Sequence, residues 1–161
     1  MPFTPFHLGA GLLIGMLFRK WINLPVILAA SIIVDIRAAY CFFTGCYPLH
    51  GILHTFFGAA ALAIPLIIII YILRAQLSQI SNLLKIPQDY TLSSIVLGSF
   101  AGVWAHILLD SFLYTDMHPF YPSGANPLFG MFTGAEVYGF CCAGFLIGGL
   151  IYIFNLMNYN N

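Results

Sequence analysis

LHGILHTFFGAAALAIPLIIIIYIL, residues 49–73, contains no Asp, Glu, Lys or Arg and is followed by Arg74. An apolar run of about 20 residues or more is typical of a transmembrane helix. Near its start, His50 and His54 are four positions apart. Ionisable groups at membrane depth are costly and for that reason usually serve a function. The stretch therefore predicts a membrane-spanning helix with a functional site at one end.

The composition of the whole chain is that of a membrane protein. Its 161 residues are 61% hydrophobic and 6% charged, with a formal net charge of zero and a mean hydropathy of +0.95. A soluble domain typically carries about 25% charged residues. The neutral balance gives no basic surface for nucleic acid. We expect an all-α fold, a polytopic transmembrane helical bundle of about five spans that forms a single domain over residues 1–161.

Five apolar segments are the expected spans. The first and second are shorter than the ~20 residues of a straight span, so tilting or re-entry is expected there. The stretch 38–48, which holds Gly45 and ends in a proline, predicts an interfacial loop. The stretch 74–90 has apolar residues at helical spacing, which fits either a short interfacial helix or a solvated connector. The five segments are 5–18, 21–34, 49–73, 91–113 and 135–154.

Basic residues orient this bundle. Arg19 and Lys20 follow the first span, and Arg74 and Lys85 follow the third, whereas only Arg37 follows the second. The positive-inside rule then places the N-terminus on the outer face of the cell's inner or plasma membrane and the C-terminus in the cytoplasm. In this topology every candidate site residue lies toward the outer face.

Imidazole and carboxylate side chains are the candidate metal ligands. His50 with His54, and His106 with Asp110, are four positions apart, so each pair is expected on one face of one helix. Such ligands suit zinc most, with manganese or iron as alternatives, and one ion or several are compatible with the set. The predicted ligands are His7, Asp35, His50, His54, His106 and Asp110, and Asp116 and His118 are expected to lie behind the ligands or at the entrance of the site.

Simpler interpretations exist for several of these residues. Asp35 is two positions from Arg37, so a salt bridge at the membrane interface is the alternative to ligation. The histidine spacing of HGILH matches a zincin, but Gly51 stands where that motif needs its glutamate. Cys41 and Cys46 are compatible with a disulfide on an oxidising face, which the sequence alone does not decide.

Together these residues resemble the YdjM-like family of predicted membrane-bound metal-dependent hydrolases. The resemblance covers about residues 1–130 and rests on the order TPFH, Asp35, a His-x-x-x-His pair and HILLD. That family is similar to zinc-dependent phospholipase C and the single-strand-specific zinc nucleases, which cleave phosphoesters. Where the family usually has a second carboxylate, this chain has Arg37. The resemblance implies metal ligation by His7, Asp35, His50, His54, His106 and Asp110.

These features predict a membrane-embedded metal-dependent hydrolase. We expect a metal-activated water to attack a phosphoester of a membrane lipid or lipid-linked substrate, with Asp35 or Asp110 as the catalytic base. Two alternatives use the same ligands: a metal-ion or proton-coupled transporter, and a non-catalytic membrane assembly subunit with a structural metal. An oligomer is compatible with each of them.

Overall fold

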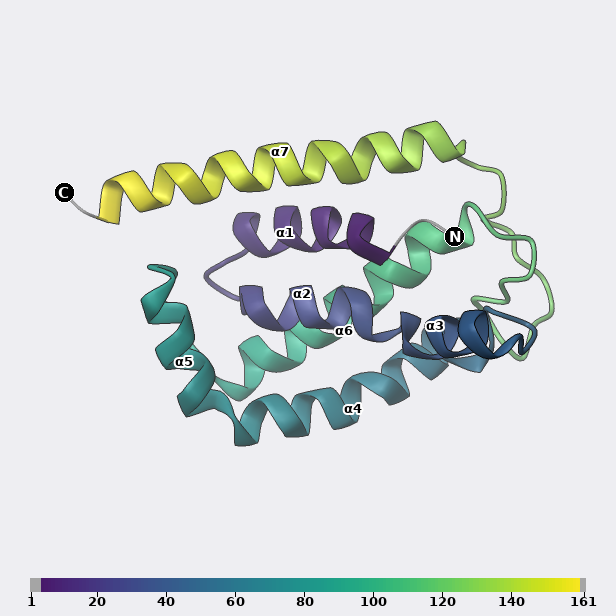
Figure 1. Ribbon diagram of the computed structural model, residues 1–161, viewed down its shortest axis with the longest axis horizontal. Helices are drawn as coiled ribbons and strands as arrows, with labels where there is room; N and C mark the ends of the chain where they lie inside the picture. The colour runs from purple at the N-terminus through teal and green to yellow at the C-terminus, as the bar shows by residue number, and fades with distance from the viewer. Residues whose placement is uncertain (1–3, 160–161) are drawn as a thin grey trace.

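The computed structural model describes residues 4–159, and every regular element in that range is helical (Figure 1). The predicted all-α fold is confirmed. In chain order the elements are η1 (Thr4–Phe6), α1 (His7–Leu17), α2 (Leu24–Ile33), α3 (Asp35–Thr44), η2 (Ile52–His54), α4 (Phe56–Ile72), α5 (Arg74–Leu83), α6 (Leu92–Ser111) and α7 (Gly134–Tyr159).

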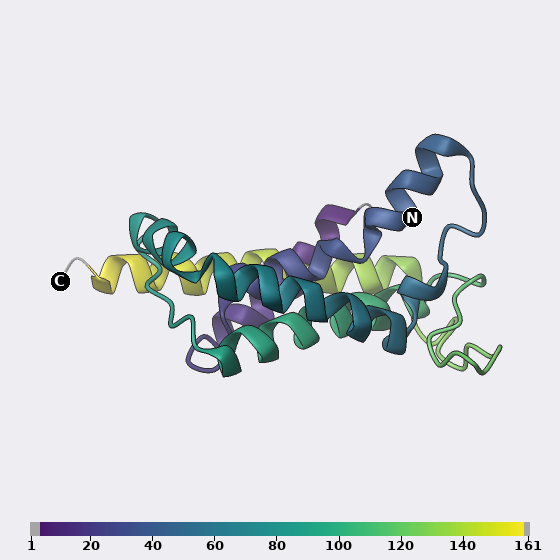
Figure 2. The same cartoon turned by 90° about the horizontal axis from the view of Figure 1, so that it is seen from below.

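The long helices pack side by side. Helix α1 packs between α7 and α2, and α6 crosses the bundle in contact with α2, α4 and α1 (Figure 1). Helix α5 turns away from α4 by 75°. Helix α3 extends the line of α2 and projects from the end of the bundle (Figure 2). Four segments therefore lie at the same end of the bundle: the start of α1, the break between α2 and α3, the start of α4 and the end of α6.

Side chains cap the start of several helices. A capping oxygen accepts a hydrogen bond from a backbone N–H of the first turn, which has no partner within the helix. Helix α7 has a reciprocal capping box, in which the Thr133 backbone N–H donates to the Glu136 carboxylate at 2.8 Å. The other capping pairs are Asn23 with the N–H of Val26 (3.2 Å), Thr55 with that of Gly58 (2.8 Å) and Thr91 with that of Ser94 (3.2 Å).

Glycines let the helices approach closely. A Cβ atom added to Gly9 of α1 would collide with the carbonyl oxygen of Cys141 in α7. One added to Gly102 of α6 would lie 2.5 Å from the Cβ of Ala30 in α2. Small residues at such contacts are typical of helix packing in membranes. The α1–α7 and α2–α6 contacts therefore leave no room for larger side chains at these positions.

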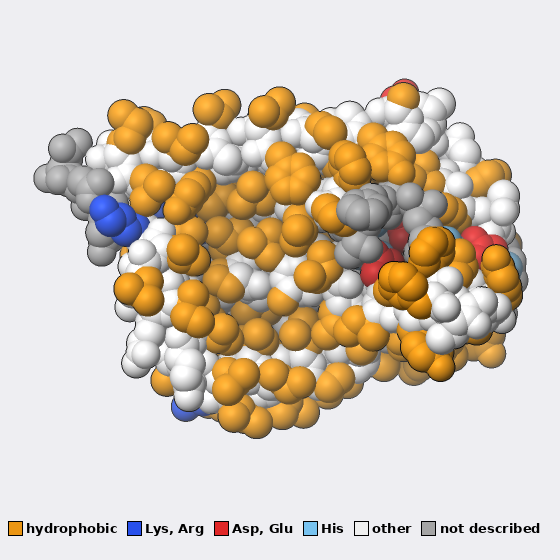
Figure 3. All heavy atoms as spheres, viewed as in Figure 1, with side chains coloured by type: hydrophobic (Ala, Val, Ile, Leu, Met, Phe, Trp, Pro, Cys, Tyr) orange, Lys and Arg blue, Asp and Glu red, His pale blue; other side chains and the backbone are white. Residues whose placement is uncertain are grey.

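Three helices in the described range are long and apolar enough to cross a membrane: Leu24–Thr44, Leu92–Ser111 and Gly134–Asn158. The bent pair α4 and α5 would make a fourth if it counts as one span. The expectation of about five spans is not confirmed, because α1 has only 11 residues. Apolar side chains cover much of the face in Figure 3, as a lipid-facing surface requires.

The predicted loop over 38–48 is wrong for most of its length. Helix α3 begins at Asp35 and ends at Thr44, where Gly45 adopts the left-handed conformation with φ of 72°. Glycine is the usual residue at this position after a helix because it has no Cβ. Asp35 therefore begins a helix instead of ending a span. A disulfide bond joins Cys41, within this helix, to Cys46, just beyond its end.

The prediction that His50 and His54 share one helix face is also wrong. Gly51 is extended, His54 ends the short helix η2, and α4 begins only at Phe56. The physical reason is local, because the Thr55 side chain caps α4 and fixes its start after both histidines. Of the two interpretations of 74–90, the structure contains the helix, which is α5 and ends at Leu83.

Candidate metal centre

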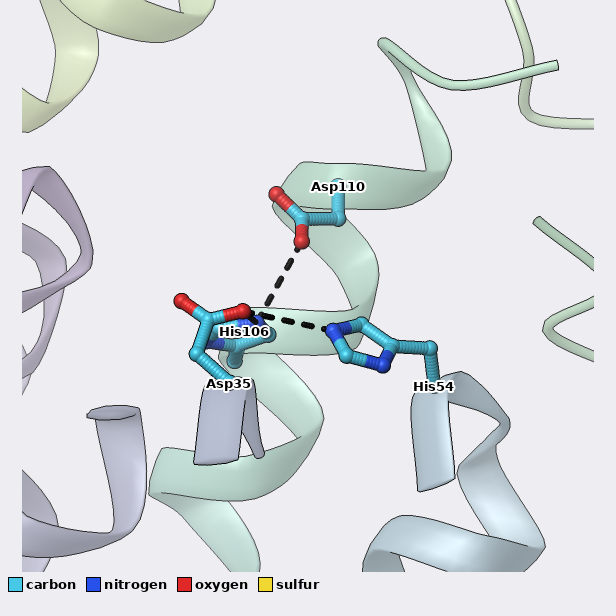
Figure 4. Close-up of side chains that lie close together, drawn as sticks. All are labelled: Asp35, His54, His106 and Asp110. Atoms are coloured by element: carbon cyan, nitrogen blue, oxygen red, sulfur yellow. Dashed lines mark hydrogen bonds and ion pairs between the residues drawn. The ribbon is translucent and has the colours of Figure 1, made fainter. Parts of the chain in front are cut away.

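Four buried side chains meet at the end of the bundle. Asp35 is the first residue of α3, His54 the last of η2, and His106 and Asp110 lie on one face of α6. Their candidate ligand atoms all lie within 4.8 Å of one another. Figure 4 shows Asp35 and Asp110 directed toward His106, with His54 opposite Asp35. Residues distant in the sequence thus form one compact cluster of two imidazoles and two carboxylates.

A backbone contact sets the orientation of His106. Its Nδ1 lies 2.7 Å from the carbonyl oxygen of Ser31 in α2. A carbonyl oxygen only accepts, so Nδ1 must carry the proton and donate it. In the neutral imidazole the lone pair is then on Nε2, which faces the cluster. Ligating histidines in metal sites are usually held in the same way through their second nitrogen.

The Nε2 atom of His106 faces two carboxylates. It lies 3.3 Å from Oδ1 of Asp35 and 3.3 Å from Oδ2 of Asp110, yet among residues 4–159 no atom meets the geometry of a hydrogen bond to it. A lone pair between two anionic oxygens is repulsive unless a cation or a proton lies between them. A buried polar atom of this kind calls for an explanation such as a bound ion.

His54 completes the set from the opposite side. Its Nε2 lies 3.3 Å from Oδ1 of Asp35, the same oxygen that faces His106. Burial lowers the pKa of His54 below its ordinary value, and the hydrogen bond with Asp35 opposes this shift without cancelling it. His54 is therefore held in the neutral form that binds metals.

His7 lies next to the four residues but outside their set. Its Nε2 is 3.0 Å from Oδ1 of Asp110, and its ring stacks on that of His106 with centroids 3.9 Å apart. Because Asp110 thereby has a histidine at each oxygen, its carboxylate is fixed in direction. The sequence predicts His7 as a ligand, and in the structure it lies outside the four-residue group, in contact with Asp110.

His50 and Asp116 lie at the outer margin of the cluster. His50 Nδ1 is 2.8 Å from Oδ1 of Asp116, whose side chain is 43% exposed. The His50 ring is 4.9 Å from that of His54 and 4.2 Å from that of Tyr114. Asp116 thus connects the buried histidines with the surface. His118 is exposed, and its imidazole makes no hydrogen bond or ion pair within the described residues.

Two contributors, Ser31 and Tyr114, were not predicted from the sequence. Ser31 acts through its carbonyl oxygen, which any residue supplies, so no sequence signal marks it. Tyr114 is four positions after Asp110, and this helical spacing is the sequence feature that indicates its place beside the cluster. Burial and the charge of Asp110 raise the pKa of Tyr114, so its hydroxyl stays protonated. Arg37, whose salt bridge with Asp35 was the alternative to ligation, donates instead to the carbonyl oxygens of Pro48 and Leu49 at 2.9 and 3.0 Å.

The donor set fits a divalent metal ion. Imidazole nitrogen and carboxylate oxygen are the ligands that zinc, manganese and iron accept in proteins. Of the six predicted ligands, the structure brings Asp35, His54, His106 and Asp110 into one group. His7 and His50 lie in a surrounding layer against Asp110 and His54. The cluster can therefore bind a metal ion.

Fold and site together define an all-helical protein with three helices that can cross a membrane and a buried His/Asp cluster that can bind a metal ion. Comparison with known proteins found no matching family model, no matching curated protein and no matching solved structure. The residues of the cluster and their surroundings therefore carry the functional argument.

Proposed function

We propose that this protein is a membrane-embedded metal-dependent hydrolase that acts on a phosphoester of a lipid or lipid-linked substrate. The observation that carries the proposal is the convergence of Asp35, His54, His106 and Asp110 within 4.8 Å. The resemblance of the same residues to predicted membrane-bound metal-dependent hydrolases supports the reaction class. Zinc is the metal we favour, since two imidazoles and two carboxylates are ordinary zinc ligands.

In this proposal, different residues of the chain bind the metal, orient a ligand and accept a proton. His54 and His106 would hold the metal as neutral imidazoles, and His7 fixes the direction of Asp110. A divalent ion at this point supplies Lewis acidity and lowers the pKa of its water toward about 7. Acceptance of the water proton would fall to Asp35 or Asp110, the two carboxylates of the cluster. Arg37 holds the segment before His50, which borders the site.

The position of the cluster supports a lipid-like substrate. The cluster lies at one end of the bundle, at the start of α1 and the end of α6, and we place that end at the level of the lipid headgroups. Asp116 gives this end a polar margin. The loop after α6 is tied over the end of that helix, because the Asn126 amide donates to the carbonyl oxygen of Ser111 at 2.9 Å. We place the substrate phosphoester at this margin.

The orientation that fits these features has the cluster on the outer face. Figure 3 shows basic side chains at one end of the molecule and acidic side chains and histidines at the other. The Cys41–Cys46 disulfide lies at the acidic end, and disulfides persist in oxidising compartments. The positive-inside rule places the basic end in the cytoplasm. Both arguments support the same orientation.

Burial favours a second candidate, a structural metal. His54 and His106 are 0% and 1% exposed, as is typical of closed sites with no position open to substrate. In that case removal of the ion would destabilise the fold without loss of any reaction. Asp116 is half-exposed and contacts His50, whose ring lies next to that of His54. This connection between the surface and the cluster favours an open catalytic site over a closed one.

The test is hydrolysis by the zinc-loaded protein in lipid nanodiscs, with dioctanoyl phosphatidic acid and bis-p-nitrophenyl phosphate as probes. We expect Asp35→Asn to lower the rate by about 10²-fold or more, the size of a general-base effect. His118→Ala, which removes an exposed imidazole without partners, should stay within about twofold of wild type. No hydrolysis of either probe by zinc-bound protein, together with a large loss of thermal stability on chelation, would identify a structural metal.

A further inference from the structure

A second polar site lies at the end of the bundle opposite the metal centre. Helix α1 begins at His7, beside the cluster, and the loop that follows its far end carries Arg19 and Lys20. Those two residues line a pocket of about 490 Å³, whose other walls are α5 and the segment that joins α5 to α6. The hydroxyl of Ser78 and the amide of Asn82 line the wall formed by α5.

The charge of the pocket suits an anion. Two cations and one carboxylate, that of Asp89, line it. Within the described residues, the side chains of Arg19 and Lys20 form no ion pair or hydrogen bond. Two unpaired cations beside a hydroxyl and an amide are the groups that recognise phosphate oxygens, and arginine does so with two parallel hydrogen bonds.

Hydrogen bonds hold the walls of the pocket in place without a ligand. The side-chain oxygen of Gln88 accepts from the backbone N–H of Leu24 at 2.9 Å, which joins the segment before α6 to the start of α2. The Tyr90 hydroxyl lies 2.8 Å from that of Ser81, which joins the same segment to α5. The pocket is therefore largely formed in advance, which lowers the cost of binding.

The surroundings indicate that the phosphate belongs to a lipid. A groove of about 310 Å³ shares Arg19 and Lys20 with the pocket and continues along Trp21 and Leu97. Trp21 is 61% exposed and Leu97 is 50% exposed. Exposed tryptophan is typical of the membrane–water interface. A ligand with a phosphate and an apolar chain matches both parts, whereas a soluble phosphate uses only the pocket.

We propose that the Arg19–Lys20 pocket binds the phosphate of an anionic lipid headgroup, with the lipid's apolar portion along Trp21 and Leu97. Basic pockets between helices are a known mode of headgroup recognition. This site is separate from the metal centre and does not depend on the proposed hydrolase activity.

The test is native mass spectrometry of the full chain in neutral detergent with equal amounts of dioctanoyl phosphatidylglycerol and dioctanoyl phosphatidylcholine. We expect the wild type to retain the anionic lipid in clear excess. Arg19→Gln and Lys20→Gln should each weaken its binding about fivefold, the change that about 1 kcal/mol per basic residue produces. Asn82→Asp, which keeps both cations and adds a negative charge to the wall, should weaken it as well.

Arg74→Gln is the matched control, because Arg74 is a basic residue outside the pocket, stacked 4.2 Å over the ring of Tyr71. It should leave binding within about twofold of wild type. Equal retention of the two lipids, or an equal loss in Arg74→Gln, would overturn the proposal. Binding of two soluble phosphates, sodium phosphate and glycerol 3-phosphate, is measured in the same way. If either binds as tightly as the lipid, the proposal that the phosphate belongs to a lipid is wrong. Unchanged unfolding temperatures show that the variants are folded.

Discussion

The Nδ1 atom of His106 donates a hydrogen bond to the carbonyl oxygen of Ser31 across the α2–α6 contact, at 2.7 Å. This contact decides the chemistry of the cluster, since it directs the Nε2 lone pair toward Asp35 and Asp110. An ionised carboxylate only accepts hydrogen bonds, so neither Asp35 nor Asp110 can donate one to this lone pair. A cation between the three groups, or a proton on Nε2, relieves the repulsion between the lone pair and the carboxylates, and the first of these is the physical basis for the proposed metal centre.

Removal of the His7 imidazole should weaken metal binding without abolishing it. His7 contacts Asp110 but lies outside the four-residue set, so His7→Ala leaves every ligand in place and frees one to rotate. Loss of such supporting contacts typically lowers metal affinity about 10- to 100-fold. The measurement is a zinc titration against a chelating indicator in detergent. Identical affinities for His7→Ala and wild type would show that Asp110 needs no support from His7.

Arg37→Gln should destabilise the protein while its metal content stays intact. The guanidinium donates to two carbonyl oxygens in the segment that precedes His50, and these bonds hold α3 against that segment. We expect a loss of about 1–2 kcal/mol in the free energy of unfolding, since the contacts are partly solvated. Chemical denaturation in detergent measures it, with Lys20→Gln as the control for loss of a basic residue. A variant as stable as wild type would show that these two hydrogen bonds of Arg37 do not stabilise the fold.

Gly9→Ala should cost more stability than Gly139→Ala. A Cβ on Gly9 meets the carbonyl oxygen of Cys141 across the α1–α7 contact, whereas a Cβ on Gly139 meets nothing within 4 Å. Overpacking at such a contact typically costs about 1–3 kcal/mol, and a change from glycine to alanine in an open helix position is neutral or stabilising. Thermal unfolding of the pair in detergent compares them directly. Equal losses would mean that α1 and α7 do not pack as closely as described.

Cysteine labelling should report the disulfide and the orientation together. Cys141 and Cys142 are free thiols, and Cys41 and Cys46 are paired. Alkylation of the denatured chain should therefore modify two cysteines before reduction and four after it. In intact cells, a membrane-impermeant maleimide should reach Cys41 and Cys46 after mild reduction if the metal centre faces outward. Labelling of these residues only after the cells are opened would place the centre in the cytoplasm.

Part of the fold and site was predictable from the sequence, for definable reasons. His106 and Asp110 lie within one uninterrupted apolar helix, where a spacing of four positions fixes a shared face. His50 and His54 have the same spacing, but Gly51 and the Thr55 cap interrupt the helix, so the pattern failed there. The span count of about five is not confirmed because α1 is short, and only tertiary packing shows where such a segment lies.

The contact that orients the site was outside the reach of pattern analysis. The Ser31 carbonyl is a backbone group, and its meeting with His106 depends on how closely α2 and α6 approach. That approach depends in turn on Gly102, whose lack of a side chain admits Ala30. Sequence patterns indicate which residues carry chemistry, whereas helix crossing decides which of them meet.

Elemental analysis of the detergent-purified protein tests the central claim most directly. Wild type, His54→Ala, Asp110→Ala and the control His118→Ala are each incubated with zinc and with manganese, desalted and measured by mass spectrometry of the elements. The account predicts stoichiometric metal in wild type and His118→Ala, and its loss in His54→Ala and Asp110→Ala. A folded wild type that stays metal-free after both incubations would contradict the account, and the cluster would then be a network of buried ion pairs and protons.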